Sequence, residues 1–376
     1  MEHLGTPWGE FELVRHPHDE RSGLRAWDAA DEYLLRHLAE TGWDPAGTLV
    51  VLGDRWGALT TALAGHGPVQ ITDSFLGRTA TAENLERNGR PPVTLLTTRD
   101  TPPGRIDTLL VRVPKSLSLL EDQLRRLAPA VHAGTVIVGT GMVKEIHTST
   151  LNLFETILGP TRTSLAVRKA RLILCEPDPS LPRVPSPWPL RYDLPPDAGA
   201  AAGRPVVNHA GIFSADHLDI GTRFLLRHLP RGDFGRVIDL GCGNGVVGMA
   251  AALLHPDAEL LFVDESYQAV ASAEETFRAN ATNRAEFRAA NALTDAEPRS
   301  ADLVLNNPPF HSHQATTDAT AWQMFTGARR TLDRGGELWV IGNRHLGYHV
   351  KLRRIFGNCT TVASNPKFVL LRAVRR

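Results

Sequence analysis

The stretch that decides the fold reads Val237-Ile238-Asp239-Leu240-Gly241-Cys242-Gly243-Asn244-Gly245-Val246-Val247-Gly248. An apolar run, an acidic residue, glycines at alternate positions and a second apolar run follow one another. This order is typical of a buried strand that turns tightly into a helix, because glycine tolerates positive φ and a close backbone approach. Asp264 lies nineteen residues after Gly245, where a second strand would end. The stretch therefore predicts an α/β sheet with a cofactor loop at the carboxyl end of a strand.

The same glycine spacing occurs in nicotinamide and flavin enzymes, so two classes of cofactor compete for this loop. Three features favour S-adenosyl-L-methionine. Asp239 suits a cationic amino-acid group, whereas its carboxylate would repel a pyrophosphate. The C-terminal strands expected at Leu338–Gly342 and Thr360–Leu371 fit a seven-stranded sheet with a final antiparallel strand. The tetrapeptide Asn307-Pro308-Pro309-Phe310 has no role in hydride transfer.

The Asn307-Pro308-Pro309-Phe310 turn follows an expected strand and so lies over the crevice in which ligands bind. Consecutive prolines fix two φ angles and remove two backbone donors. The Asn307 side-chain carbonyl and the Pro308 backbone carbonyl can each accept one N–H of an exocyclic amine, so that its lone pair faces a methyl group. Phe310 offers a face for base stacking, worth about 1–3 kcal/mol. The turn predicts methylation of a planar amine by positioning, without a strong base.

Apolar runs alternate with amphipathic stretches in both halves of the chain, which is the pattern of a parallel α/β sheet. In the second half the expected elements are Arg236–Leu240, Gly248–Leu254, Leu260–Asp264, Tyr267–Asn280, Asp302–Asn306, Ala319–Leu332 and Glu337–Gly342. In the first half they are Thr48–Leu52, Leu59–Ala64, Val69–Thr72, Thr79–Asn88, Thr108–Val113, Leu117–Leu127 and Thr135–Gly139. Both halves end in a helix and further strands, at Leu151–Gly159 and Ser164–Leu174 and at Val350–Gly357 and Thr360–Val374. We predict two tandem Rossmann-like class I methyltransferase domains from an internal duplication, each with a seven-stranded, mostly parallel sheet and an antiparallel last strand.

The two expected copies differ where chemistry would take place. Val51–Gly57 stands opposite Asp239–Gly245, and Val111–Lys115 stands opposite the Asn-Pro-Pro-Phe turn, with the polar positions replaced. The first copy therefore predicts a fold without a catalyst. Between the copies, 176–205 is rich in proline, glycine and alanine, and we expect it to hold no regular element. The predicted domains are 1–175, a linker at 176–205, and a catalytic domain at 206–376.

The overall charge of the chain does not indicate a partner, whereas the distribution of charge along the chain does. The 41 Lys or Arg balance the 41 Asp or Glu, so net charge alone does not indicate a nucleic-acid binder. The region from Leu338 to Arg376 nevertheless has no acidic residue and eight basic ones: Arg344, Lys351, Arg353, Arg354, Lys367, Arg372, Arg375 and Arg376. This rim can hold phosphates, although a solvated helix face with a basic tail has the same composition.

Cysteine spacing and hydropathy set further expectations. Cys175, Cys242 and Cys359 have no metal-type spacing, so we expect neither a metal site nor a disulfide framework. The sequence has no run of eighteen apolar residues and no charged-then-apolar leader, which predicts a cytoplasmic protein without a membrane partner. We expect it to act as a monomer.

Together these motifs closely resemble those of the bacterial ribosomal RNA guanine-N2 methyltransferases. The resemblance covers nearly all of 206–376, on Gly211–Ser214, Val237–Gly248, Phe262–Ser266, Asn307–His311, Gly342–Leu346 and Ile355–Thr361. The last two segments are more like the large-subunit members than the small-subunit members. The resemblance implies S-adenosyl-L-methionine as cofactor, an unstacked guanine N2 in 23S ribosomal RNA as substrate, and an N-terminal domain that docks RNA without binding cofactor.

From the motifs and the resemblance we expect three groups of functional residues. The catalytic group is Asn307, Pro308 and Phe310. The cofactor-binding group is Phe213, Asp239, Gly241, Cys242, Gly243, Asn244, Gly245, Asp264, Glu265, Asn291 and Asn307. The substrate-binding group is Pro309, Phe310, His311, Arg344, Lys367 and Phe368. By resemblance, Asp219 and Gly221 continue the segment that brings Gly211 and Phe213 near the cofactor.

Several alternatives stay open at this point. Turn chemistry at strand ends also explains Asp264 and Asn291, and a Pro-Pro pair also occurs in ordinary loops. The acceptor can instead be 16S ribosomal RNA, a protein glutamine or a DNA adenine. A non-catalytic RNA-assembly factor with a vestigial cofactor site is a further class, against which the intact motifs of the second half argue.

Overall fold

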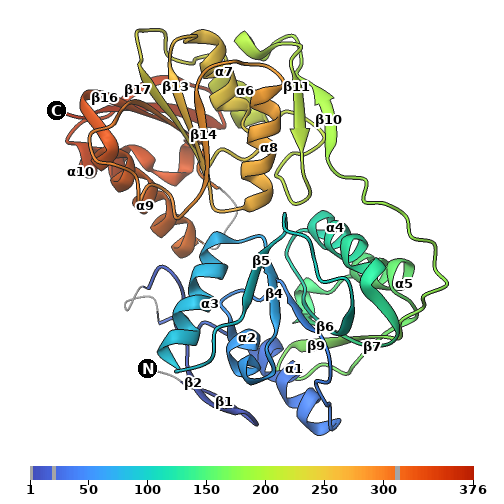
Figure 1. Ribbon diagram of the computed structural model, residues 1–376. Coiled ribbons are helices and arrows are strands. Elements are labelled where there is room, and N and C mark those ends of the chain that lie inside the picture. The colour runs from blue at the N-terminus through green and yellow to red at the C-terminus, as the bar shows by residue number, and fades with distance from the viewer. Residues whose placement is uncertain (1–2, 19–22, 310–313) are drawn as a thin grey trace. The chain divides into compact units, whose positions relative to one another are not determined.

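Two seven-stranded sheets with the same strand order form the fold, one in each half of the chain (Figure 1). The computed structural model describes residues 3–18, 23–309 and 314–376, without the side chains of 314–318. The chain divides into the units Met1–Trp188 and Pro189–Arg376.

In the sheet of the second unit, the strand that comes first in the sequence lies inside, third in the strand order. Across the sheet the order is β14 (Ala285–Ala289), β13 (Glu259–Asp264), β12 (Arg236–Leu240), β15 (Ala301–Asn306), β16 (Leu332–Asn343), β18 (Phe368–Val374) and β17 (Thr360–Ser364). Pairing is parallel from β14 to β16 and antiparallel between β16 and β18. Val237, Ile238 and Leu240 of β12 are completely buried, as expected for a strand covered on both faces.

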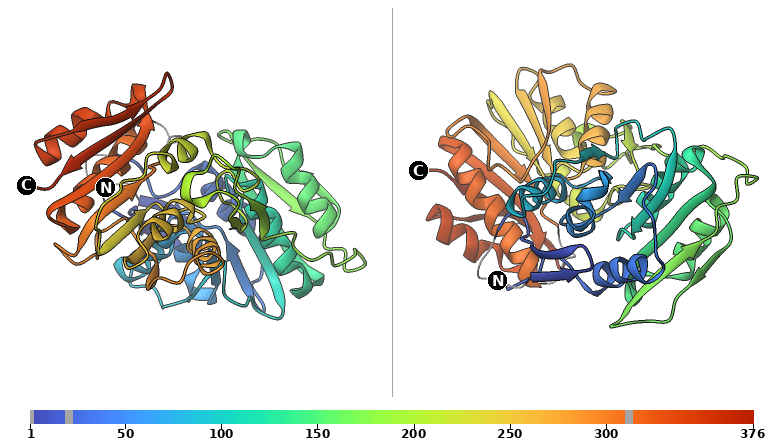
Figure 2. Two further views of the ribbon diagram at one scale, coloured as in Figure 1. Left: turned by 90° about the horizontal axis from the view of Figure 1, so that it is seen from above. Right: turned by 60° about the horizontal axis from the view of Figure 1, so that its bottom comes forward.

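Helices cover both faces of this sheet (Figure 2). They are α6 (Ile220–Leu226), α7 (Val246–Leu254), α8 (Tyr267–Arg278), α9 (Gln314–Thr331) and α10 (Tyr348–Phe356). Apolar residues of α6, α7 and α8 form one core cluster with the sheet, and those of α9 and α10 form the other. The strand order changes direction at β12, between β13 and β15, so the carboxyl ends of these strands form the crevice in which α/β proteins bind ligands.

The first unit repeats this architecture. Its sheet runs β5 (Thr94–Thr97), β4 (Val69–Thr72), β3 (Leu49–Leu52), β6 (Ile106–Arg112), β7 (Val131–Met142), β9 (Ala170–Cys175) and β8 (Thr161–Thr163). Its helices are α1 (Ala29–Glu40), α2 (Ala58–Ala62), α3 (Phe75–Arg87), α4 (Leu117–Leu127) and α5 (Thr148–Ile157). A hairpin of β1 (His3–Thr6) and β2 (Gly9–Glu12) precedes them. The expected class I architecture, with its antiparallel last strand, is thus confirmed.

Two sequence-based expectations about single elements are wrong. Region 176–205 does hold regular structure, because β10 (Leu190–Asp193) pairs with β11 (Pro205–Asn208) and a 3₁₀ turn covers Gly199–Ala201. Four proline-free residues suffice for β10, and a proline is tolerated at the first position of β11. The single strand expected at Thr360–Leu371 is two strands, β17 and β18, of which β18 pairs with β16.

Candidate functional site

The glycine loop joins β12 to α7 at the carboxyl edge of the sheet. Gly241, Gly243 and Gly245 have φ values of +72°, +52° and +76°. A Cβ added to Gly245 would lie 2.6 Å from the Cα of Ala273, so this glycine lets α7 pack closely on α8. A Cβ added to Gly243 would meet no atom within 4 Å. The loop is therefore closed on its helix side and open at Gly243, where a ligand can approach the backbone.

Asp239 lies beneath the loop rather than in the open crevice. Its side chain is 2% exposed, and its Oδ2 accepts the backbone N–H of Gly248 at 2.7 Å. Burial raises the pKa of Asp239 to about 8, and this single hydrogen bond offsets the shift only in part. A desolvated carboxyl of this kind favours a cationic ligand, because a positive charge would stabilise its ionised form.

Asp264 ends β13 and holds the loop from the other side. Its Oδ2 accepts the N–H of Gly243 at 3.0 Å and its Oδ1 accepts the N–H of Ser266 at 3.1 Å. Burial raises the pKa of Asp264 as well. The next residue, Glu265, is exposed at the strand end. Two acidic side chains therefore lie at the end of β13, Asp264 bonded to the loop and Glu265 at the surface.

The remaining residues that we predicted to lie near the cofactor contact other parts of the unit. Cys242 is 6% exposed, belongs to the apolar core and has a pKa that burial raises well above its ordinary value. The Asn244 Nδ2 donates to the Asn208 Oδ1 of β11 at 3.0 Å. Asn291 follows β14, and its Oδ1 accepts the Nε2 of Gln323 at 2.8 Å, which leaves its Nδ2 as the group that can donate to a ligand.

The side-chain amide of Asn307 is oriented by Thr222 and Asp219. The Thr222 hydroxyl lies 3.3 Å from the Asp219 Oδ2, a carboxylate oxygen that can only accept. The hydroxyl therefore donates to Asp219 and accepts from the Asn307 Nδ2, which lies 3.0 Å away. This relay fixes the amide so that its carbonyl oxygen is the unused acceptor. That oxygen is buried and has no hydrogen-bond partner among the described residues.

The remaining predicted residues lie in different environments. Pro308 is buried and Pro309 exposed, while Phe310 and His311 lie outside the described residues. Phe213 is 61% exposed, ahead of α6. The exposed Arg344 and Lys367 are neighbours, since the Arg344 N–H donates to the Lys367 carbonyl at 3.0 Å. Phe368 is 4% exposed and packs against Gly221, which gives it a place in the core rather than on an open substrate surface.

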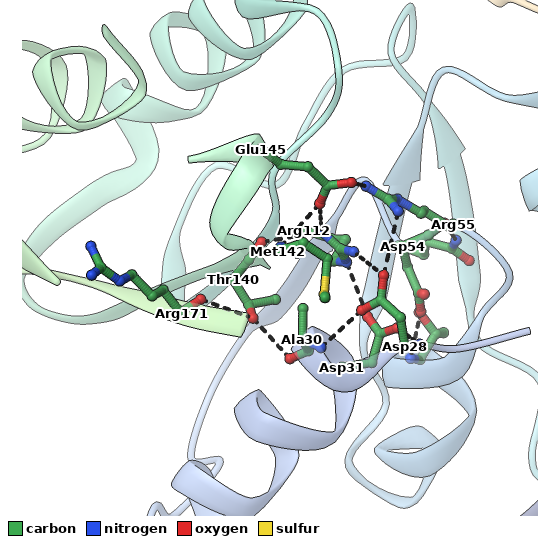
Figure 3. Close-up of polar contacts among 12 residues, drawn as sticks. Asp28, Ala30, Asp31, Asp54, Arg55, Arg112, Thr140, Met142, Glu145 and Arg171 are labelled. Carbon is green, nitrogen blue, oxygen red and sulfur yellow. Dashed lines mark hydrogen bonds and ion pairs between the residues drawn. The ribbon is translucent and has the colours of Figure 1, made fainter. Parts of the chain in front are cut away.

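In the first unit, ion pairs occupy the place of this site (Figure 3). The strand register places Arg112 where the second unit has Asn307. Arg112 is completely buried and lies 2.6 Å from Asp28, 3.2 Å from Asp31 and 3.1 Å from Glu145. Arg55 adds a 2.8 Å contact to Glu145. Burial tends to raise the pKa of Glu145, but Arg55 and Arg112 together lower it to about 2.

Sequence reasoning did not single out Thr222 or Gln323, and it reached Asp219 only through the resemblance. Asp219 is the N-cap of α6, and its Oδ2 also accepts the Thr222 N–H at 2.8 Å. An Asp followed three residues later by Thr, at the start of a helix, is the local signal that could have indicated Thr222. No local signal connects Asp219 or Thr222 to Asn307, which lies 85 positions from Thr222.

Neither metal nor membrane features emerge from the part of the chain that the structure describes. None of its His, Cys, Asp and Glu side chains gather in threes or more at a place that could hold a metal ion. None of its helices combines the length and apolar character needed to cross a membrane.

The sheet order, the glycine loop and the Asn-Pro-Pro turn define a class I methyltransferase, a class that uses S-adenosyl-L-methionine as methyl donor. A family model described as Methyltransferase small domain matches residues 203–372, and one described as RLMG N-terminal domain matches residues 1–179. The chain belongs to the ribosomal RNA large subunit methyltransferase G family.

Relatives of that name match over nearly the whole chain. The protein from Streptomyces avermitilis is 71% identical over 99% of both chains, and the protein from Aeromonas salmonicida is 46% identical over 99% of both. Among solved structures, the T. thermophilus 16S rRNA N2 G1207 methyltransferase in complex with AdoMet and guanosine has a TM-score of 0.77. It covers 100% of this chain and 98% of its own, and its 20% identity supports the fold alone.

Proposed function

We propose that this enzyme transfers a methyl group from S-adenosyl-L-methionine to the exocyclic N2 of an unstacked guanine in 23S ribosomal RNA. The observation that carries the proposal is the fixed Asn307 amide, whose buried carbonyl oxygen is free to accept a donor beside Pro308. An aromatic amine brings two N–H donors to such a place, and a duplex base would have to leave its stack to reach it.

Residues around the glycine loop fit the cofactor. The pKa values of Asp239 and Asp264 are raised by burial, and neither side chain forms an ion pair with a described residue. A cationic ligand would supply the missing positive charge. Gly243 leaves the backbone open to it. We assign cofactor binding to the predicted set, namely Phe213, Asp239, Gly241, Cys242, Gly243, Asn244, Gly245, Asp264, Glu265, Asn291 and Asn307.

The reaction needs positioning from the chain rather than a strong base. When bound, S-adenosyl-L-methionine supplies an electrophilic methyl group. The Asn307 Oδ1 accepts one N–H of the amine and the Pro308 carbonyl accepts the other, which draws the nitrogen toward tetrahedral geometry. Its lone pair is then held in one direction, and the amine proton leaves after transfer. Preorganised acceptors of this kind contribute about 3–4 kcal/mol each.

The support for guanine as the acceptor base comes from the relatives and not from the geometry of the site. The curated relatives are named for the large ribosomal subunit, and the T. thermophilus structure is named for N2 of a guanine in 16S ribosomal RNA. We combine the two into guanine N2 of 23S ribosomal RNA; the same reaction on 16S ribosomal RNA, or on another planar amine, is the alternative. Ribosomal RNA as substrate places the proposed reaction in the cytoplasm.

We further propose that the first unit arose by duplication and now docks RNA without binding cofactor. The identical strand order of the two sheets supports common origin. Arg112 and Arg55, with their acidic partners, fill the region that corresponds to Asn307 and Gly243. We expect one chain to suffice for activity.

The direct test is methylation of ribosomal RNA with tritiated cofactor, followed by mapping of the modified base. We expect Asn307→Ala to leave cofactor affinity nearly unchanged, because the other ten assigned residues still hold the cofactor, and to lower turnover at least about a hundredfold, the usual cost of one preorganised polar contact. Asn307→Ala with wild-type turnover would refute the role of the amide. Modification of any atom other than a guanine N2 would refute the assigned acceptor.

A further inference from the structure

Exposed basic side chains lie on α9 and α10, in the part of these helices whose side chains the structure describes. Residues 319–331 and 348–356 contain five Lys or Arg and no Asp or Glu, while Asp318 of α9 lies outside the side chains that the structure describes. We define the α9–α10 face by five of the residues that these helices expose, namely Trp322, Arg329, Val350, Arg353 and Arg354. None of its three arginines forms an ion pair with a described residue. Arg330 is not part of this face, because its guanidinium donates to the carbonyls of Leu293, Thr294 and Ala296.

Some exposed arginines of the second unit have acidic partners, whereas Arg231, Arg299 and Arg334 form no ion pair with a described residue. Arg278 on α8 pairs with Glu274, and Arg284 beside β14 pairs with Glu259. Arg372, in the basic C-terminal region itself, pairs with Glu337. Unpaired arginines are therefore not confined to the α9–α10 face, but among the described residues of this unit Arg354 is the arginine that lies over an aromatic ring.

The α9–α10 face also contains an aromatic ring next to its basic side chains. The Arg354 guanidinium lies over the Trp322 ring, 5.2 Å from its centroid. Trp322 is 37% exposed and Val350 61% exposed. Behind them, the rings of Phe325 and Tyr348 meet edge to face with centroids 5.3 Å apart, which fixes the two helices against each other. An arginine stacked on an aromatic ring, on a preformed surface, is suited to unpaired bases and phosphates.

The face is continuous with the edge of the candidate site. β15 and β16 are parallel, with Asn306 paired to Val340, so Asn343 ends β16 close to the level of Asn307. The exposed Arg344 follows at once and lies beside Lys367. α10 then begins at Tyr348, four residues after Arg344, and contains Arg353 and Arg354 in its last turn.

We propose that the α9–α10 face docks the substrate RNA, with Arg353 and Arg354 on phosphates and the Trp322–Arg354 pair stacking an unpaired base. This inference rests on the proposed function and adds a second contact area to it. Charge complementarity selects RNA as the occupant, since phosphate neutralisation supplies much of the affinity of nucleic-acid complexes.

The test uses the full chain and a transcript of large-subunit ribosomal RNA. With Arg353→Glu and Arg354→Glu combined, we expect the KM for RNA to rise at least about tenfold. The slope of log affinity against log salt should fall by about 1–2, one unit for each phosphate that the variant no longer neutralises. Cofactor affinity and the unfolding temperature should stay unchanged, because both side chains are exposed. Trp322→Ala should also weaken RNA binding, and Trp322→Phe should restore part of it.

Arg284→Glu is the matched control, because it reverses an 84% exposed charge next to β14, at the other end of the sheet. It should leave the KM for RNA unchanged. If the α9–α10 variants methylate RNA with wild-type KM and salt slope, this inference is overturned while the proposed function stands. A defect seen only on assembled ribosomal particles, with naked RNA unaffected, would assign the face to a protein partner and also overturn it. If the wild-type chain methylates no RNA, the proposed function itself fails.

Discussion

At the scale of single residues, the orientation of the Asn307 amide depends on Thr222 and Asp219. We predict that Thr222→Val, which keeps the shape of the side chain but cannot accept the Asn307 N–H, lowers turnover roughly tenfold. That factor corresponds to about 1.4 kcal/mol, the net worth of one hydrogen bond. Cofactor affinity and the KM for RNA should change little, because Thr222 positions the catalytic amide. Steady-state kinetics with separate kcat and KM values measure this split.

Thr222→Ser is the control, since it restores a hydroxyl that can donate to Asp219 and accept from Asn307. It should recover most of the turnover. Wild-type turnover in Thr222→Val, or an equal decrease in Thr222→Ser, would show that the relay does not govern the amide.

Asp239 links cofactor binding to pH. Its pKa, raised to about 8 by burial, means that the folded protein holds a proton that the unfolded chain releases near pH 4. The free energy of unfolding of the cofactor-free protein should therefore fall as pH rises from about 4 to about 8. A cationic ligand favours the ionised carboxylate, so cofactor affinity should rise over the upper part of this window, with release of a proton.

Calorimetry in two buffers of different ionisation enthalpy measures that proton. Asp239→Asn should reduce its release, and Asp264, whose pKa is also raised, accounts for any remainder. Binding without proton release in the wild-type protein near pH 7 would contradict the link.

At the scale of elements, the turn between β12 and α7 contains two glycines with different roles. Gly245 is needed for packing, and we expect Gly243 to be needed for cofactor binding. We predict that Gly245→Ala destabilises the protein by about 2–4 kcal/mol, because a left-handed φ of +76° adds to a clash with the Cα of Ala273. Gly243→Ala should cost only about 1–2 kcal/mol, since its Cβ meets nothing in the protein. It should nevertheless weaken cofactor binding, because the Cβ would stand where the backbone is open.

Thermal unfolding and equilibrium binding distinguish the two variants. A Gly243→Ala protein that binds cofactor with unchanged affinity would show that the ligand does not approach the loop there.

Local sequence was enough for the elements that carry strong patterns. The apolar runs Arg236–Leu240 and Val69–Thr72 and the helix Leu117–Leu127 have the predicted bounds. β10 was missed because its surroundings are rich in proline and its only partner, β11, lies across a loop. The class of the site followed from Asp239, Gly243 and Asn307, whereas the Thr222 contact depends on how the sheet brings distant segments together.

At the scale of the whole molecule, we expect the second unit alone to be sufficient for cofactor binding. We predict that a fragment 189–376 binds S-adenosyl-L-methionine with nearly the affinity of the full chain but binds ribosomal RNA more weakly. The first unit supplies none of the proposed cofactor contacts, and we assign RNA docking to it. Equal RNA affinity of fragment and full chain would remove that role.

The start of the fragment matters, because β10 pairs with β11 at four positions. β11 and the residue after it also bond to α8: the Thr276 hydroxyl accepts the Val207 N–H at 3.0 Å, and the Ser272 hydroxyl accepts the His209 N–H at 2.9 Å. A fragment 206–376 leaves out β10 and exposes this edge, so it should unfold at a lower temperature than 189–376. Equal unfolding temperatures would mean that β10 belongs to the connection between the units and not to the second unit.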